Sequence, residues 1–376
     1  METSAEAPAG AGTDEVPAGA TAGAGTEAGS AGRSRARWCL GTRLLVAGTA
    51  AWAVFVAAHV LLTGRWWFWL VVESMPPVTL VVVPLLLLAV TPLARPVRRR
   101  LSVVLLALLL LGAQLAGVSP LGLAQGDGPP GGALKVFSWS TDVWEMSDDP
   151  VRFYDYLRAQ RADVYLLQEY LHWGDGPLRV DDLARVRAAF PGYHIATEGE
   201  LITISRLPIV ATYPRRTSPT GTDWYWRGNK ALRVDVRSGT RVLSLYNVHL
   251  PVPIRTERSP LTAGFYEFVR DQYQRRRGEF AALRADLARN PNPAVVAGDF
   301  NSAWMNLIPP GEGLRRLDPE GSALPLTWPT SAFAIPLPRL WRLDWVFTTE
   351  EVRVPRYRLV PSISDHLAQE LYVSLN

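Results

Sequence analysis

The sequence predicts an α/β domain that follows a set of membrane-spanning helices. Three apolar runs near the N-terminus each approach the ~20 residues that a helix needs to cross a bilayer. From Leu134 onwards, apolar runs of strand length alternate with helix-length segments, which is typical of an α/β fold. Several strand-length runs end in a carboxylate, an amide or a histidine, so we expect the polar chemistry at strand ends.

Composition narrows the class of protein. The chain has 376 residues, and 48% of them are hydrophobic, which is high for a wholly soluble protein. The net charge is +4, but Lys135 and Lys230 are the only lysines among the cations, and this balance does not indicate a nucleic-acid surface. Cys39 is the only cysteine, which excludes an intrachain disulfide and a cysteine-based metal cluster.

The N-terminal part divides into a tail and a helical region. Residues 1–36 are mostly small or polar and cannot bury a core, so they predict a disordered cytoplasmic tail. Residues 37–118 predict a transmembrane region with three spans, near 44–63, 76–94 and 101–118. The runs lack the polar faces that buried helices of a soluble bundle would show.

Arginines predict the orientation of these spans. Four precede the first span and four lie between the second and third, whereas the first loop holds only Arg65. The positive-inside rule then places the N-terminus in the cytoplasm and everything after residue 118 outside the cell. The sequence therefore predicts a multi-pass protein of the plasma membrane. A Gly/Pro-rich linker, residues 119–133, would keep the domain at 134–376 close to the bilayer.

The C-terminal region shows the alternation in detail. Predicted strands lie near 134–140, 163–168, 200–204, 229–237, 241–248, 294–299, 342–348 and 353–360. Predicted helices lie near 150–161, 180–190 and 268–289. Two long segments, 251–267 and 307–340, look like loops, and loops of this length in a compact domain are usually functional.

Five polar motifs accompany the strands in a fixed order. They are Gln168-Glu169, Asn247-Val248-His249, Gly298-Asp299-Phe300-Asn301, Leu343-Asp344 and Ser364-Asp365-His366. Any one of them alone is more often a solvated turn or a packed side chain than a catalytic group. The combination is far more specific than its members.

Through these motifs, residues 134–376 resemble the endonuclease/exonuclease/phosphatase superfamily, which contains DNase I-like nucleases, neutral sphingomyelinases and inositol polyphosphate phosphatases. The resemblance implies a four-layer α/β/β/α sandwich with one metal-dependent site at the sheet edges. Three spans ahead of such a domain also resemble the VanJ-type membrane proteins of actinobacteria, which are associated with glycopeptide antibiotic resistance.

The resemblance implies a role for each motif residue. Glu169 suits a hard cation, Mg²⁺ or Mn²⁺, and Asp365 is expected to assist the metal. His366 is the expected general base on the attacking water, with Asp344 holding its ring in the useful tautomer. Asp299 is expected to orient the water or the leaving group.

The other candidates bind phosphate or complete the first strand. Asn301 is expected to donate to a phosphoryl oxygen, and His249 to bind the phosphate or protonate the leaving group. The family's first strand usually ends in Asn, whereas Ser140 stands here and offers a shorter reach and one donor fewer. Asp142 is a candidate to compensate, with an exposed turn residue as the equal alternative.

The sequence restricts the substrate only to a class. Arg255, Arg258 and Arg270 are interleaved with aromatic residues and suit either a phosphate headgroup or a solvated helix face with ordinary core aromatics. The run Trp224-Tyr225-Trp226 is a candidate to enter the bilayer.

We therefore predict a membrane-anchored, metal-dependent phosphoesterase, a phosphatase or phosphodiesterase of lipid-linked or envelope substrates. The bilayer and a phosphorylated substrate are its expected partners, because tethering favours substrates that lie in the membrane. An extracytoplasmic nuclease is the first alternative, and an inactive binding domain is the second. The oligomeric state is not indicated.

Overall fold

The computed structural model describes residues 38–123, 128, 131–147, 149–213, 223–255, 258–332 and 335–375. The predicted tail, residues 1–36, lies outside the described residues. Cys39–Asn376 form one compact unit that contains both the N-terminal helices and the sheets.

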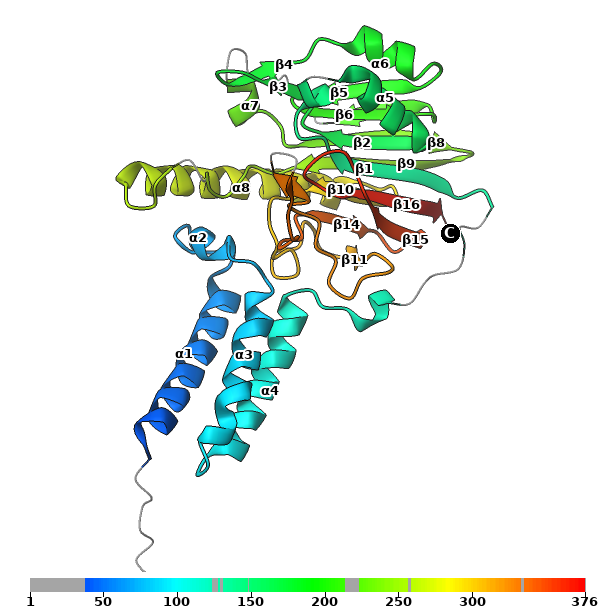
Figure 1. The fold of residues 1–376 in the computed structure, drawn as a ribbon. Coiled ribbons are helices and arrows are strands. Elements are labelled where there is room, and N and C mark those ends of the chain that lie inside the picture. The colour runs from blue at the N-terminus through cyan, green and yellow to red at the C-terminus, as the bar shows by residue number, and fades with distance from the viewer. Residues whose placement is uncertain are drawn as a thin grey trace, which may run out of the picture. The chain divides into compact units, whose positions relative to one another are not determined.

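Two mixed six-stranded sheets make up the C-terminal part (Figure 1). The first contains β1 (Leu134–Ser140), β2 (Val164–Gln168), β5 (His194–Glu198), β6 (Leu201–Ser205), β15 (Val352–Val360) and β16 (Ala368–Leu375). The second contains β7 (Ile209–Tyr213), β8 (Ala231–Ser238), β9 (Arg241–His249), β10 (Ala294–Asp299), β11 (Arg315–Leu317) and β14 (Asp344–Thr348). Their strand orders are β15-β16-β1-β2-β6-β5 and β11-β14-β10-β9-β8-β7.

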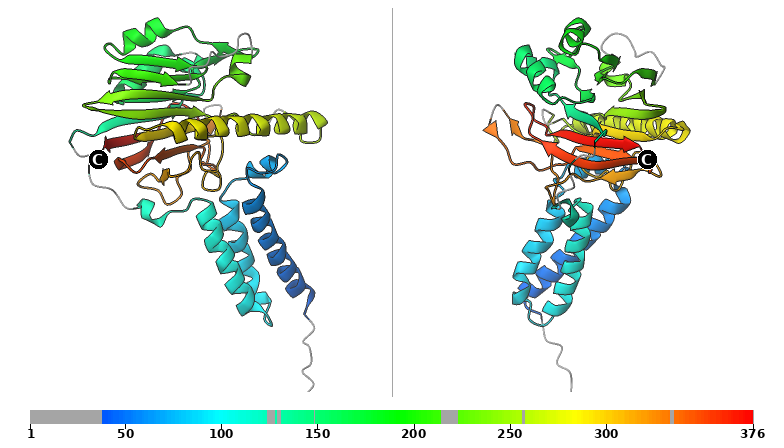
Figure 2. Two further views of the ribbon diagram at one scale, coloured as in Figure 1. Left: turned by 180° about the vertical axis from the view of Figure 1, so that it is seen from behind. Right: turned by 90° about the vertical axis from the view of Figure 1, so that its right-hand side faces the viewer.

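Helices cover the outer face of each sheet, as the two further views show (Figure 2). On the first sheet lie α5 (Pro150–Ala159) and α6 (Leu183–Ala189), and the Phe153 ring of α5 lies 5.7 Å from the Trp139 ring of β1. On the second lies α8 (Ala263–Arg289), whose Phe280 packs with Tyr246 of β9. Between the sheets, aliphatic side chains of both form one buried cluster. This is the predicted α/β/β/α sandwich.

The position of a strand within its sheet explains whether the sequence predicts that strand. The central strands β2 and β10 are buried along their whole length, so they are continuous apolar runs. All eight predicted strands are present within a few residues. The edge strands β5 and β7 were not predicted, because they are half-exposed and carry few consecutive apolar residues. Two short hairpins complete the domain, β3 (Leu171–Trp173) with β4 (Pro177–Arg179) and β12 (Ser331–Ala332) with β13 (Ile335–Pro336).

The N-terminal region corrects the prediction of three spans. It contains α1 (Leu40–Leu62), α2 (Trp69–Glu73), α3 (Thr79–Val90), the 3₁₀ turn η1 (Thr91–Leu93) and α4 (Arg98–Leu115). Of the helices described, α1 alone is long and apolar enough to cross a membrane. The 12 residues of α3 extend about 18 Å, short of a hydrocarbon core of about 30 Å. Three arginines occupy the first turn of α4. The multi-pass topology is therefore not supported.

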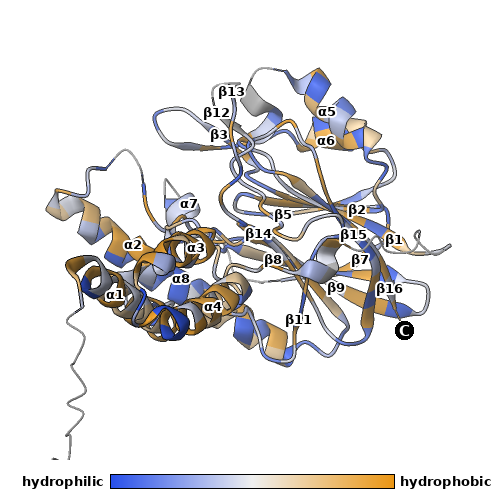
Figure 3. Cartoon of the chain, turned by 60° about the horizontal axis from the view of Figure 1, so that its bottom comes forward, coloured by the Kyte–Doolittle hydropathy of each residue, from blue (hydrophilic) through white to orange (hydrophobic). Residues whose placement is uncertain are grey.

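Much of the surface of these helices is nevertheless apolar and exposed. Figure 3 shows hydrophobic residues over α1, α3 and α4. Leu44 and Val54 of α1 are 62% and 69% exposed, and Leu110 of α4 is 72% exposed. An exposed apolar surface on several helices is unusual for a soluble protein and marks a contact with lipid or protein.

The N-terminal helices also support a loop of the α/β part. Trp304, five residues beyond the end of β10, is fully buried in one cluster with Val56 of α1, Leu80 of α3 and Leu115 of α4. Its indole N–H donates to the carbonyl of Glu73 at 2.6 Å. The Trp341 indole similarly donates to a carbonyl just after α2, at 3.0 Å. The helices are therefore packed against the domain and contribute to its core.

The predicted linker is partly described. Pro120–Leu123 form a 3₁₀ turn, η2, and the Ser119 N–H donates to the Ala323 carbonyl at 2.8 Å. Residues 124–127, 129 and 130 lie outside the described part. The described half of this connector is thus attached to the loop that contains Ala323.

Candidate active site

Strand register brings three predicted residues to one edge of the second sheet. His249 ends β9, Asp299 ends β10 and Asp344 begins β14. Asp299 pairs with His249 on one side and with Asp344 on the other. Because β9 and β10 are parallel and β14 runs opposite, the ends of the first two meet the start of the third. The three side chains therefore lie next to one another.

A buried amide pair joins the two sheets beneath this edge. Ser140 ends β1 and pairs with Gln168, which ends β2 and precedes Glu169. Gln168 Nε2 donates to Asn247 Oδ1 at 2.6 Å, and the Asn247 amide donates to two backbone carbonyls of the first sheet. Both amides are fully buried. Buried pairs of this kind hold adjacent elements in one arrangement, so this one sets the separation between Glu169 and the second sheet.

The Glu169 carboxylate is oriented by backbone conformations that such residues seldom adopt. Glu169 has φ 65°, and in the facing loop Asp142 and Val143 have φ 52° and 65°. The Val143 N–H donates to Oε2 at 3.0 Å and the Ser140 hydroxyl to Oε1 at 3.2 Å. Conformations of this kind cost about 1–3 kcal/mol each and cluster at functional sites. Ser140 thus contacts Glu169 from the position where the family has Asn.

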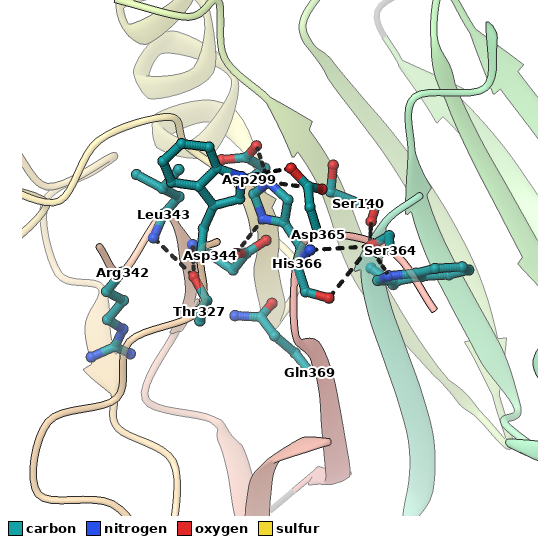
Figure 4. Close-up of polar contacts among 12 residues, drawn as sticks. Ser140, Asp299, Thr327, Arg342, Leu343, Asp344, Ser364, Asp365, His366 and Gln369 are labelled. Carbon is teal, nitrogen blue, oxygen red and sulfur yellow. Dashed lines mark hydrogen bonds and ion pairs between the residues drawn. The ribbon is translucent and has the colours of Figure 1, made fainter. Parts of the chain in front are cut away.

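His366 and Asp344 form a buried pair (Figure 4). His366 Nδ1 lies 2.8 Å from Asp344 Oδ2, and Nε2 lies 3.8 Å from Asp299 Oδ2. The two paired residues are 5% and 2% exposed. Burial favours the neutral ring, but Asp344, Asp365 and Asp299 outweigh it and raise the pKa of His366 well above its usual value. The arrangement fixes the ring with Nε2 directed toward Asp299.

The loop that carries His366 is held from both sides. The Ser364 hydroxyl accepts from the Trp139 indole at 2.8 Å, donates to the last carbonyl of β1 at 2.8 Å and accepts from the His366 N–H at 3.1 Å. Asp365 Oδ2 accepts from the Trp328 indole at 2.6 Å, while Oδ1 lies 4.0 Å from His366 Nε2. The Ser-Asp-His motif is therefore rigid, with one Asp365 oxygen directed toward the site.

A second supported histidine faces Asp299 from the opposite side. His249 Nε2 lies 3.7 Å from Asp299 Oδ2 and 4.0 Å from Glu169 Oε1. Its Nδ1 lies 3.3 Å from Glu200 Oε2, and Glu200 forms a buried ion pair with Lys230. Burial lowers the pKa of His249, but Glu200 outweighs it and raises that pKa to about 9. Glu200 therefore favours the protonated form of His249.

Glu200 and Lys230 were not among the predicted site residues. Each directly precedes a strand, β6 and β8 respectively, which is the only local signal. Because β2 pairs antiparallel with β6, Gln168 lies opposite Leu201. The next residues along the two chains, Glu169 and Glu200, therefore lie at the same end of this strand pair. The sequence contains no sign of that pairing.

The turn after β10 requires glycine at one position. Gly298 has φ 142°, and a Cβ there would lie 2.0 Å from the Val248 carbonyl oxygen. The Asn301 N–H donates to Asp299 Oδ1 at 2.7 Å, and Asn301 Nδ2 donates to the Leu250 carbonyl at 2.9 Å. One amide N–H of Asn301 is thus used within the protein, and the other has no hydrogen-bond partner among the described residues. Burial, followed by Asp344, raises the pKa of Asp299.

The carboxylates around Glu169 fit a hard cation. Among the described residues, no three His, Cys, Asp or Glu side chains form a ready-made metal cluster. Mg²⁺ does not need one, since it takes one or two carboxylates and fills its shell with waters and phosphate oxygens. Asp142 is solvent-accessible overall, yet partial burial of its carboxylate, then Asp365 and Glu169, raise its pKa to about 6. A cation would relieve this crowding of negative charge.

The helix α7 (Asp223–Arg227) forms one wall of the site. Burial, then Glu200 and Glu169, raise the pKa of Tyr225 well above its usual value, and Lys230 Nζ lies 4.1 Å from the Tyr225 ring centre. The Arg255 guanidinium lies 4.5 Å from the Trp226 ring centre. Trp224 is 4% exposed, so the predicted entry into a bilayer is wrong for that residue.

The arginine- and aromatic-rich segment after His249 divides in two. Arg255 and Arg258 lie over the Phe268 ring, at 5.5 and 5.1 Å from its centre. Phe265 is 4% exposed and packs with Leu70 of α2, so it is a core residue. Phe265 therefore fits the alternative of ordinary core aromatics, and a contact of Arg255 or Arg258 with a phosphate headgroup stays a prediction.

Comparisons with known proteins identify the family of the chain. The profile of the Endonuclease/Exonuclease/phosphatase family, whose members typically use a divalent metal, matches residues 131–366. No curated protein matches the chain.

Solved structures of similar fold come from several bacteria. A family protein from Leptotrichia buccalis C-1013-b is 16% identical with a TM-score of 0.44, over 65% of this chain and 100% of that one. A protein from Bacteroides vulgatus is 15% identical with a TM-score of 0.46, over 65% and 99%. Beta toxin from Staphylococcus aureus is 11% identical with a TM-score of 0.44, over 64% and 99%. On the family profile, which covers more than half of its length, the chain belongs to the endonuclease/exonuclease/phosphatase family of phosphoesterases.

Proposed function

We propose that this phosphoesterase hydrolyses a phosphate ester or pyrophosphate bond of a lipid-linked or cell-envelope substrate while anchored to a membrane. One observation carries the catalytic part of the proposal. Asp299 Oδ2 lies between two acid-supported histidines, 3.7 Å from His249 Nε2 and 3.8 Å from His366 Nε2. A base and an acid on opposite sides of one carboxylate suit the displacement of a leaving group by water.

In this proposal each histidine moves one proton. His366 Nε2 takes a proton from the attacking water, while Asp344 holds the proton on Nδ1 and stabilises the imidazolium that forms. Asp299 orients that water. His249 is cationic because of Glu200, so it attracts the phosphoryl group and gives its Nε2 proton to the leaving oxygen.

Glu169 would hold the cation, Mg²⁺ or Mn²⁺, with Asp365 and Asp142 adding negative charge nearby. When bound, the cation supplies positive charge to the phosphoryl oxygens and offsets the carboxylates that raise the pKa of His366. The free N–H of Asn301 donates to a phosphoryl oxygen. Tyr225 and Arg255 lie beside the substrate, on the side of the site where α7 is found.

Membrane anchoring rests on α1 and on the apolar surface beside it. The 23 residues of α1 extend about 35 Å, enough to cross the hydrocarbon core. Arginines 33, 35, 37 and 43 lie before or at its start and Arg65 follows it, so one span gives the same orientation that three spans predicted, with the α/β part outside the cell. The VanJ-type subgroup and its link to antibiotic resistance stay a prediction, because they rest on three spans.

A substrate screen tests the chemistry. The full chain is needed, because the N-terminal helices contribute to the core of the domain. Purified in detergent with Mg²⁺, it should release phosphate from lipid pyrophosphates or an alcohol and a phosphomonoester from phosphodiester lipids, and His366→Ala should not. Hydrolysis of DNA alone would establish the nuclease alternative. A folded chain inactive on every substrate would support the inactive binding domain.

Anchoring and orientation have their own test. A reporter fused after Asn376 that works only outside the cytoplasm should be active, and one that fluoresces only in the cytoplasm should stay dark. A bright cytoplasmic reporter, or a chain released from membranes by alkaline carbonate, contradicts this part of the proposal without touching the catalytic part.

A further inference from the structure

A second pocket lies where the end of α1 meets α8, and none of the proposed catalytic residues lines it. Its volume is about 420 Å³. Its cationic lining consists of Arg65, Arg276, Arg277 and Arg284, against Glu73 as the only acidic lining residue. Apolar walls come from residues including Leu70, Phe280 and Ile308. The pocket therefore combines a surplus of positive charge with hydrophobic surface.

Three of these arginines are available to a ligand. Arg65, Arg277 and Arg284 are exposed, and none of them forms an ion pair with any residue that the structure describes. Arg65 and Arg284 each donate one bond to a backbone carbonyl, at 3.3 and 2.8 Å. A guanidinium has five N–H donors, so most remain free.

The other two charged residues are already engaged. Arg276 is 4% exposed and donates to the carbonyls of Pro251 and Phe300. The Glu73 carboxylate accepts from the Gly64 N–H at 2.8 Å. Burial raises the pKa of Glu73, while the Gly64 N–H and the charge of Arg276 act in the opposite direction. Glu73 therefore repels an incoming anion less than a free carboxylate would.

The chain position of the pocket relates it to a membrane surface. Arg65 lies three residues beyond the end of α1, the one candidate span. Beside it, Trp66 and Phe68 are 45% and 38% exposed. Exposed aromatic residues at the end of a span lie at the level of the lipid headgroups. The arginines of this pocket are therefore at the depth of lipid phosphates if α1 spans the bilayer.

We propose that this pocket binds the phosphate of an anionic phospholipid headgroup. The inference rests on the proposed anchoring of α1 and does not depend on the proposed hydrolysis. Guanidinium groups bind phosphate oxygens with paired, charge-assisted hydrogen bonds, and the apolar wall accommodates the glycerol and first acyl carbons. A choline headgroup would bring its own cation to the arginines, so a zwitterionic lipid is disfavoured.

Lipid titration tests the proposal on the full chain. Purified in a neutral detergent with EDTA to prevent hydrolysis, the protein is titrated with short-chain phosphatidylglycerol, short-chain phosphatidylcholine or inorganic phosphate. The readout is the thermal midpoint followed by tryptophan fluorescence, because a ligand of the folded state raises it. Phosphatidylglycerol should raise the midpoint, and the other two ligands should not.

Variants locate the effect. Arg277→Gln/Arg284→Gln should weaken phosphatidylglycerol binding by about 10- to 100-fold, because two charge-assisted contacts are lost. The matched control, Arg152→Gln/Arg187→Gln, removes the same charge at exposed positions of α5 and α6 and should bind as the wild type does.

Three results would overturn the inference. They are equal binding by the double variant and the wild type, equal stabilisation by inorganic phosphate, and no stabilisation by the anionic lipid. If any of these results is obtained and the chain still hydrolyses its substrate at the wild-type rate, the lipid-binding inference has failed and the proposed function has not.

Discussion

The buried pair of His366 and Asp344 allows a sharp test of the proposed catalysis. If His366 is the general base, His366→Ala should lower kcat by about 10²- to 10⁴-fold with little change in substrate affinity. Asp344 contributes a buried, charge-assisted hydrogen bond of 2.8 Å. Such bonds contribute about 1.5–3 kcal/mol, so its loss in Asp344→Ala should cost about 10- to 150-fold in rate.

Asparagine at this position should be worse than alanine. When the amide of Asp344→Asn turns its NH₂ toward Nδ1, the ring carries its proton on Nε2 and cannot accept one from water. We expect a loss of about 10²- to 10⁴-fold. Formation of the hydrolysis products by the full chain at saturating Mg²⁺ measures each rate, and circular dichroism shows whether the fold is intact. His194→Ala, an exposed histidine on β5, is the control and should retain full activity.

The double variant shows whether Asp344 acts through His366 or elsewhere in the site. A base and the residue that orients it act as one unit, so His366→Ala/Asp344→Ala should resemble His366→Ala alone. Losses that multiply, in variants that remain folded, would mean that Asp344 acts elsewhere in the site, for instance on the cation. The pairing of the two residues as base and support would then be refuted.

Three further predictions follow from single contacts. Glu169→Gln should raise the Mg²⁺ concentration needed for half-maximal rate by at least about tenfold, since an amide is a poor ligand for a hard dication, and hydrolysis that survives exhaustive chelation would contradict this. Gly298→Ala should lower the free energy of unfolding by about 2–6 kcal/mol through strain and the contact with Val248. Gly192→Ala, where φ is 81° but a Cβ meets nothing, should show the strain alone, and equal losses in chemical denaturation would count against the contact. Burial alone would raise the pKa of Glu200, but Lys230 and His249 lower it from 4.5 to about 2. The contribution of the Glu200 carboxylate to the stability of the fold is therefore complete above about pH 5 and is lost as the pH falls toward 2. Lys230→Met should lower the free energy of unfolding by about 3–5 kcal/mol at neutral pH. It should also weaken the decrease of the thermal midpoint at acid pH, and an unchanged decrease would argue against this pair.

Local sequence patterns determined much of the domain. The central strands β2 and β10 are buried on both faces, so they appear as apolar runs whose ends are marked by Glu169 and Asp299. A functional side chain that directly follows such a run must lie at a sheet edge, whatever the rest of the fold. The pairing of Asp344 with His366 was also predicted, from the resemblance of their motifs, and the structure places them 2.8 Å apart.

Tertiary structure alone decided the features that depend on pairing between distant segments. Glu200 and Lys230 enter the site through the register of β6 and β8, which no local pattern encodes. Arg65 joins the three arginines of α8 in the second pocket because α2 packs on α8, with Leu70 against Val269. The difference between the three predicted spans and the one observed also depends in part on tertiary packing. Hydropathy measures how apolar a run is, whereas the length of regular helix depends on where prolines and arginines interrupt it and on which side chains pack against its neighbours.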